Sequence, residues 1–236
     1  MVDDLRKRLA EHEAARQRAL NRRRGLVLAN TAGVIGVAAS AIAAFFWLPD
    51  GSSGLFVRYP GFYEPAGFTV AIWVLILILM SASVAYQWHI HRRHDEARGA
   101  FIERIGLLFF ASCIVCSIWV FAWRYDITTL SIITILALLF ILIAIYRRLR
   151  IGLRPVENNE KYLVHVPFSV YLGWIAMATM AVITAAIGNV DFGGFEINRQ
   201  FWGVFIITLG IIMVLIMFQE YHDIFFAMVV DWSLLG

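Results

Sequence analysis

The sequence predicts an all-α protein, a polytopic bundle of transmembrane helices, and three observations support this fold class. First, residues 166–188 carry no charge. As a helix rising about 1.5 Å per residue, this run can cross a hydrocarbon core of about 30 Å. Second, 61% of the 236 residues are hydrophobic and the mean hydropathy is +0.74, more apolar than is usual for soluble domains. Third, lysine and arginine gather in alternate connections between apolar runs.

The N-terminal segment, residues 1–24, is polar, favours a helix and carries mixed charge. We expect a solvated or amphipathic arm whose arginines meet anionic lipid, with partner docking as the alternative. Polar or Gly- and Pro-containing connections then separate six apolar runs, residues 25–48, 68–87, 105–123, 127–146, 166–188 and 201–218.

Two connections constrain the bundle further. Only residues 124–126 separate the third run from the fourth, so these spans are predicted to be antiparallel neighbours. After the sixth run, residues 224–236 form an apolar segment of 13 residues, short of a normal crossing. A truncated, half-crossing or tilted helix remains open for this segment.

The topology follows from the basic residues. The arm and the connections after the second and fourth spans hold 17 of the 20 lysines and arginines. Only Arg58, Arg124 and Arg199 lie elsewhere. The positive-inside rule therefore predicts a multi-pass protein with its N-terminus in the cytoplasm.

Three segments carry a family resemblance: residues 59–73 (YPGFYEPAGFTVAIW), 116–125 (CSIWVFAWRY) and 167–174 (PFSVYLGW). Together they resemble the tryptophan-rich sensory protein family (TspO, the translocator or peripheral benzodiazepine receptor family). The longer, seven-span bacterial branch is the more similar one. The resemblance covers roughly residues 25–235.

The resemblance implies a five-helix bundle whose aromatic side chains line a cavity, in a bacterial inner membrane. Family members bind porphyrins and other tetrapyrroles, and some bind sterols or drug-like aromatics. They act as sensors, transporters or scavengers. Residues 1–24 would then form a cytoplasmic arm, residues 25–200 the five-span bundle, and residues 201–236 one or two additional spans.

The chain departs from the family pattern at three positions. Cys116 stands three residues before Trp119, where the family usually has asparagine, and Val182 replaces a second asparagine. Arg124 stands where the seven-span branch often has histidine. Because both asparagines would have faced the cavity, the resemblance implies a drier cavity here.

The tryptophans fall into two groups by depth. Those near span ends, Trp47, Trp88, Trp123 and Trp202, are typical of an aromatic belt at the membrane interface. Trp73, Trp119 and Trp174 lie deeper in the predicted spans. Flat aromatic walls with an N–H donor suit a planar conjugated ligand, although such residues also serve as core packing.

With the resemblance, the candidate ligand-binding residues are Phe68, Trp73, Cys116, Trp119, Tyr171, Trp174 and Ala178. Tyr171 would supply a hydrogen bond to the ligand. The sequence identifies no definite cofactor, but porphyrin or haem, bacteriochlorophyll or carotenoid would each suit as a bound ligand.

Other chemistry is less favoured. Cys113 and Cys116 are spaced for helix packing, and His89, His91 and His94 stand in a basic loop, so we expect no metal site. The sequence contains no recognisable catalytic triad, carboxylate pair or phosphate-binding glycine loop. We therefore expect no catalytic residues, no enzyme and no nucleic-acid partner.

Asn30 and Asp231 are the candidate functional polar residues of the apolar runs. We expect Asn30 to bridge two helices by a side-chain hydrogen bond. Asp231 is the acid of the last run, and an intramembrane carboxylate is a functional candidate by default. A short last helix would instead leave Asp231 near water or a partner chain.

Two functions from different classes remain. The first is a cavity that binds a planar hydrophobic molecule, a tetrapyrrole or an isoprenoid, for sensing or transport. The second is a non-catalytic accessory subunit of a larger membrane complex, pigment-bearing, photosynthetic or respiratory. The predicted partners are the lipid bilayer and a hydrophobic small molecule, and a homodimer or a larger complex is open.

Overall fold

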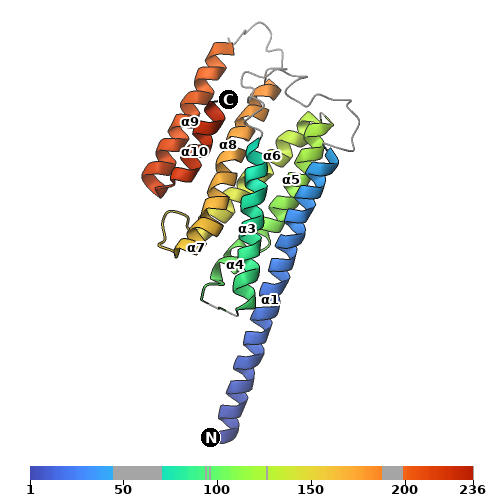
Figure 1. Ribbon diagram of the computed structural model, residues 1–236, viewed down its shortest axis with the longest axis vertical. Helices are drawn as coiled ribbons and strands as arrows, with labels where there is room; N and C mark the ends of the chain where they lie inside the picture. The colour runs from blue at the N-terminus through green and yellow to red at the C-terminus, as the bar shows by residue number, and fades with distance from the viewer. Residues whose placement is uncertain (45–70, 94, 96, 126, 188–198, 236) are drawn as a thin grey trace.

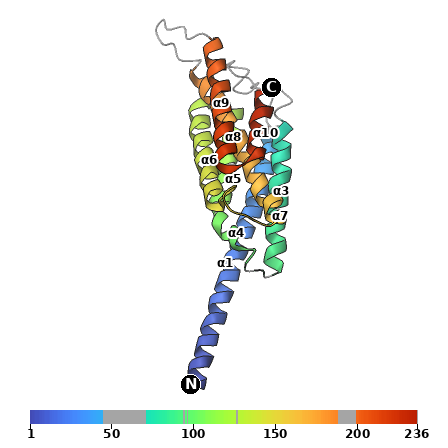
Figure 2. The same ribbon diagram turned by 90° about the vertical axis from the view of Figure 1, so that its left-hand side faces the viewer.

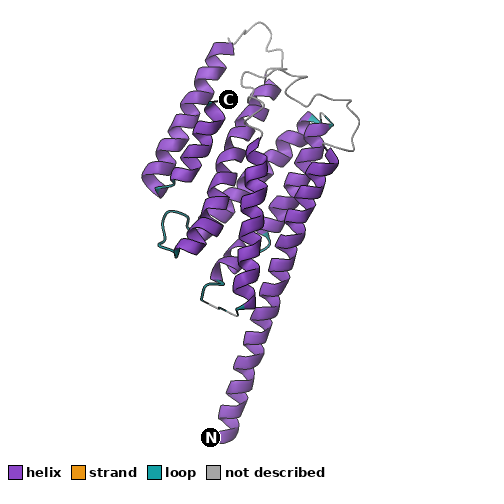
Figure 3. Cartoon of the chain, in the orientation of Figure 1, coloured by secondary structure: helices purple, strands orange, loops and turns teal. Residues whose placement is uncertain are grey.

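The computed structural model describes residues 1–44, 71–93, 95, 97–125, 127–187 and 199–235 (Figure 1). Within these residues the regular structure is helical, without a strand (Figure 3). The predicted all-α helical bundle is therefore confirmed.

The helices pack along a common direction (Figure 1). In chain order they are α1 (Val2–Ile42), α3 (Ile72–Arg92), α4 (Ala100–Ile105), α5 (Leu108–Arg124), α6 (Thr128–Leu149), α7 (Asn158–Glu160), a π-helical turn (Lys161–His165), α8 (Val166–Ile187), α9 (Arg199–Tyr221) and α10 (Ile224–Leu234).

Helix α1 joins the charged arm to the first span without a break. The arm is rich in alanine, leucine, arginine and glutamate, and it contains neither glycine nor proline before Gly25, so helix propensity is high throughout. Figure 1 shows its N-terminal half projecting beyond the other helices. The arm is thus a continuous helical extension of the first span.

Helix ends coincide with residues that adopt left-handed backbone angles. Gly106, at φ +55°, separates α4 from α5, so the third span begins later than the predicted residue 105. Arg150 ends α6 at φ +54°, and His222 turns the chain between α9 and α10 at φ +51°. The predicted basic connection at residues 147–165 is partly helical, because α7 and the π-helical turn lead directly into α8.

Helix α8 is the central element of the bundle. It contacts α3, α6, α9 and α10. Phe168, Ile175 and Met177 are at most 1% exposed. This explains why the run lacks charge on every face: other helices, rather than lipid, cover most of it.

The chain is an integral, multi-pass membrane protein. Four of the described helices are long and apolar enough to cross a bilayer, and three shorter apolar helices accompany them. Large apolar side chains on the outside of the bundle, such as Ile78, Ile133, Phe140 and Val204, are more than half exposed. Contact with the lipid bilayer accounts for their exposure, since lipid is as apolar as they are.

Helices α9 and α10 form a hairpin against α8. Helix α10 contacts both α8 and α9, and Figure 2 shows the hairpin covering one side of the bundle. Asp223 anchors the hairpin: its Oδ1 accepts from the backbone N–H of Phe226 at 3.2 Å, and its Oδ2 accepts from the Tyr146 hydroxyl at 2.8 Å. This carboxylate caps α10 and ties it to α6.

Candidate aromatic ligand site

Four tryptophans from three helices form one cluster, the tryptophan cluster, made of Trp73, Trp119, Trp123 and Trp174. The Trp73 and Trp119 rings stack with centroids 5.6 Å apart and an interplanar angle of 26°. Trp119 and Trp123 stack at 6.3 Å and 23°. Trp174 meets Trp73 edge-on at 6.1 Å and 86°. The three deep tryptophans singled out in the sequence therefore lie together.

Trp123 lies near the end of its span, where the sequence predicts an aromatic interface belt. The structure shows in addition that its ring stacks on Trp119 in the tryptophan cluster. The available signal is its spacing: Trp119 and Trp123 stand four residues apart, so they share one face of α5. Trp73, in the first turn of α3, reaches this face because α3 begins near the end of the bundle where α5 terminates (Figure 1).

Two indole N–H groups in the cluster lack acceptors. The Nε1 atoms of Trp119 and Trp174 are buried and have no hydrogen-bond partner among the described residues. The two side chains are only 7% and 4% exposed. A buried donor without an acceptor costs about 1–3 kcal/mol. The cluster therefore combines flat apolar surfaces with two donors that an oxygen or nitrogen acceptor of a ligand would satisfy.

Tyr171 and Cys116 contact each other beside this cluster. Both side chains are buried. Tyr171 was expected to hydrogen-bond a ligand. Within the protein, its hydroxyl has the Cys116 sulfur as a polar neighbour. Cys116 is thus the polar neighbour of Tyr171, at the position where the resemblance implies asparagine.

The remaining predicted site residues have separate places. Ala178 is half-buried on α8, one turn beyond Trp174, and Val182 is fully buried. Phe68 lies outside the described residues. Cys113 is a free, buried thiol that touches α1, since a Cβ placed on Gly33 would lie 3.0 Å from the Cys113 Cβ and Sγ atoms.

The polar residues of the spans form a bridge between α1 and α3. Asn30 Nδ2 donates to Gln87 Oε1 at 2.9 Å, and both side chains are fully buried. One residue further along each helix, Trp88 Nε1 donates to Thr31 Oγ1 at 2.9 Å. The sequence predicts a bridging role for Asn30, whereas its partner Gln87 lies at the end of an apolar run and carries no such signal.

Asp231 and the histidines lie apart from the tryptophan cluster. Asp231 is exposed on α10, three residues before the helix ends at Leu234. Among the described residues, no group of three histidines, cysteines, aspartates or glutamates is placed to hold a metal ion. His94, the last member of the histidine-rich loop, lies outside them.

Comparison with known proteins identifies one family. The family model described as TSPO-like protein matches residues 27–236. No curated protein matches the chain. No solved structure matches it either.

Proposed function

The chain belongs to the TSPO-like protein family, and from this we propose that it binds a planar hydrophobic ligand at the tryptophan cluster for sensing or transport. The ligand class is a tetrapyrrole such as a porphyrin, or an isoprenoid. Members of the family are generally non-enzymatic, and we propose the same for this chain.

One observation carries this proposal: the buried Nε1 donors of Trp119 and Trp174 have no acceptor among the described residues. Core packing alone would favour apolar rings such as phenylalanine at these positions, because they carry no N–H to satisfy. A conjugated ligand with a carbonyl, carboxylate or ring-nitrogen edge would stack on the indole faces and accept these hydrogen bonds. The hydroxyl oxygen of Tyr171 offers an acceptor to a donor group of the ligand.

The proposed setting is a bacterial inner membrane with the N-terminus in the cytoplasm, in the longer, seven-span branch of the family. Residues 1–24 would be the cytoplasmic arm, 25–200 the family bundle and 201–236 the additional spans. Three basic segments support this orientation: the arm, the α3–α4 connection and the α6–α8 connection all lie at one end of the molecule (Figure 1).

The test is titration of the purified protein with protoporphyrin IX, followed by quenching of tryptophan fluorescence. Trp174→Phe keeps an aromatic ring and removes the donor, so we expect about fivefold weaker binding, the loss of one neutral hydrogen bond. The combined change Trp174→Leu and Tyr171→Leu should abolish binding, because it also removes the aromatic wall.

Trp88→Phe is the matched control, since Trp88 already donates to Thr31 outside the cluster. It should lower the fluorescence signal without changing the dissociation constant. Equal affinity of the wild type and the Leu double variant for protoporphyrin IX would exclude porphyrin binding at the cluster. The same titration with an isoprenoid such as a carotenoid then decides the remaining ligand class.

A second candidate is a non-catalytic accessory subunit of a larger membrane complex. The observation that favours it is the arm of α1, which projects from the bundle with nearly all its residues exposed (Figure 1). A continuous charged helix held outside the membrane is suited to contact a partner protein. This second candidate includes a pigment-bearing, photosynthetic or respiratory complex. A homodimer is the alternative assembly.

A further inference from the structure

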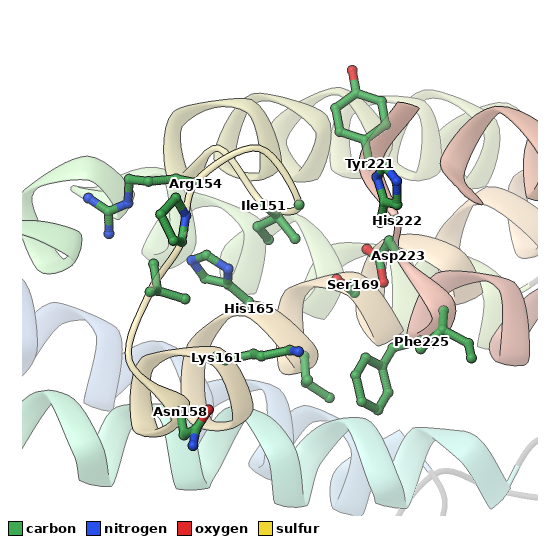
Figure 4. Close-up of a pocket in the computed structure, with 15 residues that line it drawn as sticks. Ile151, Arg154, Asn158, Lys161, His165, Ser169, Tyr221, His222, Asp223 and Phe225 are labelled. Carbon is green, nitrogen blue, oxygen red and sulfur yellow. The ribbon is translucent and has the colours of Figure 1, made fainter. Parts of the chain in front are cut away.

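A cavity of about 340 Å³ lies at the basic end of the bundle, away from the tryptophan cluster. Its walls come from three segments that are distant in sequence: the connection after α6, the helical turn that leads into α8, and the turn between α9 and α10. Figure 4 shows Lys161 and His165 on one side and Asp223 and Phe225 on the other, around a common space.

The cavity is preformed by close backbone packing. Gly152, at φ +78°, lies directly against Tyr221, and a Cβ at Gly152 would collide with the Tyr221 carbonyl. Only glycine combines this backbone angle with this approach. The α6–α8 connection is therefore held against the α9–α10 turn, which closes one side of the cavity.

The cavity contains hydrogen-bonding groups that the described residues leave unused. His165 is 5% exposed, and its Nε2 has no hydrogen-bond partner among them. The nearest acid is Glu160, whose Oε1 lies 3.8 Å from Nε2, beyond hydrogen-bond distance. The Nε of Arg154 is likewise buried without a partner, whereas its Nη2 donates to Glu160 at 2.6 Å.

On the His165 side, Lys161 carries the positive charge that is available to a ligand, because Glu160 pairs with Arg154 and lies 3.8 Å from His165 Nε2. Lys161 is exposed, and its Nζ lies 5.9 Å from the centroid of the Tyr162 ring. Asp223 also lines the cavity, but its two oxygens already accept from Phe226 and Tyr146. The wall formed by Lys161, His165 and Arg154 therefore offers donors, while the opposite carboxylate is engaged in the fold.

The cavity also stands at a boundary between polar and apolar surface. Lys161 and Asn158 precede the charge-free helix α8, which begins at Val166, and the lining continues into Ile224 and Phe225 at the start of apolar α10. A ligand that fits both parts has an anionic head and an apolar tail. Basic pockets between transmembrane helices at a membrane surface are suited to lipid headgroups.

We propose that this cavity binds the phosphate-bearing headgroup of a membrane lipid, with Lys161 and His165 as the phosphate-binding residues. The Lys161 ammonium supplies charge and His165 Nε2 supplies a buried, directed hydrogen bond. The acyl chains leave the cavity past Val166 and Phe225 along the apolar faces of α8 and α10. The site is separate from the tryptophan cluster, so either proposal can fail without the other.

The experiment counts lipids bound to the full-length protein by native mass spectrometry after delipidation in detergent. The probes are phosphatidylglycerol, diacylglycerol with the same acyl chains, and inorganic phosphate as a competitor. We expect one phosphatidylglycerol molecule to bind more tightly than any further lipid molecules. Lys161→Gln should weaken the binding of this molecule about tenfold, because one charge-assisted hydrogen bond is lost. Because Lys161 is exposed, this variant should fold normally.

Arg148→Gln is the matched control: it removes an exposed positive charge at the same end of the bundle, from a residue outside the cavity lining. Arg148→Gln should leave the binding of phosphatidylglycerol unchanged, whereas His165→Phe should weaken this binding as Lys161→Gln does.

Equal losses of binding in Lys161→Gln and Arg148→Gln would overturn the proposal, because they would indicate a diffuse effect of surface charge. Equal binding of diacylglycerol would exclude phosphate recognition, and full displacement by millimolar phosphate would show that the site binds a free anion instead of a lipid.

Discussion

At the scale of single residues, buried polar groups are the most informative feature of this chain. Asn30 and Gln87 satisfy one hydrogen bond between them, while Asn30 Oδ1 and Gln87 Nε2 stay buried without partners among the described residues. In the tryptophan cluster and in the cavity near His165, unpartnered groups support the two binding proposals. The Asn30–Gln87 pair instead joins α1 to α3, because hydrogen bonds between side chains stabilise helix association in a membrane.

We predict that Asn30→Ala lowers the free energy of unfolding by about 1–2 kcal/mol, because Gln87 then loses its partner inside the bundle. Replacing both Asn30 and Gln87 by alanine should cost less than the sum of the two single alanine changes, since no orphaned amide remains. The measurement is reversible unfolding in detergent micelles, analysed as a double-mutant cycle.

Ser40→Ala is the control on the same helix, because the Ser40 hydroxyl donates only to the Gly36 carbonyl one turn earlier. It should change stability by less than about 0.5 kcal/mol. Additive effects of the Asn30 and Gln87 changes would contradict an energetic role for their hydrogen bond.

At the scale of helices, close approach is set by small residues. Helix α1 contacts α5 extensively, and Gly33 is the point where the Cys113 side chain approaches the α1 backbone. Gly36 lies less than one turn further along α1, and a Cβ added there would have no neighbouring atom within 4 Å. These two glycines therefore have different roles: Gly33 permits packing, whereas Gly36 only lowers helix propensity.

We predict that Gly33→Ala destabilises the bundle by about 1–2 kcal/mol, because its Cβ would press on Cys113 and move α1 away from α5. Gly36→Ala, the matched control, should be neutral or stabilise the helix by up to about 1 kcal/mol. Thermal unfolding of both variants in the same detergent provides the comparison. A Gly33→Ala protein as stable as Gly36→Ala would show that the α1–α5 contact can relax freely.

At the scale of the whole molecule, the two proposed binding regions lie at opposite parts of one bundle that α8 connects. Trp174 belongs to the tryptophan cluster, and the same helix begins beside the cavity lined by His165 and Ser169. The arm of α1 extends from the basic end, beyond the bundle (Figure 1). This arrangement places any partner bound to the arm at the same end of the bundle as the cavity and away from the tryptophan cluster (Figure 1).

We predict that deleting residues 1–24 leaves the bundle folded and protoporphyrin IX binding unchanged, since most of the arm projects beyond the other helices (Figure 1) and its contact with α4 is the ion pair between Arg23 and Glu103, far from the tryptophan cluster. If the chain is an accessory subunit, the deletion should release it from a large assembly. Native mass after gentle solubilisation from its own membrane measures this. A truncated chain that still migrates with a large assembly would contradict docking through the arm, and a wild-type particle of one or two 26.8 kDa chains would contradict the subunit function.

Much of the fold was predictable because each membrane-spanning helix requires a continuous apolar run, which can be seen directly in the sequence. Apolar runs, basic connections and the short turn after residue 123 predicted a helical bundle and the order of its spans. Boundaries were less predictable: α1 runs through the arm and the first span, and α8 is preceded by helical residues in a polar connection. In both places the residues still favour a helix although they are polar, so the helix extends beyond the apolar run. The limits of an apolar run therefore do not mark the ends of the helix.

Residue types and their spacing along single segments are enough to identify a multi-pass helical membrane protein of the TSPO-like family, and to single out its deep tryptophans. Helix packing was needed to learn that Trp123 joins the cluster, that Cys116 lies beside the Tyr171 side chain, that Gln87 is the partner of Asn30, and that His165 and the α9–α10 turn line one cavity. Each of these contacts joins side chains from different segments, so its geometry depends on the rotation and approach of whole helices.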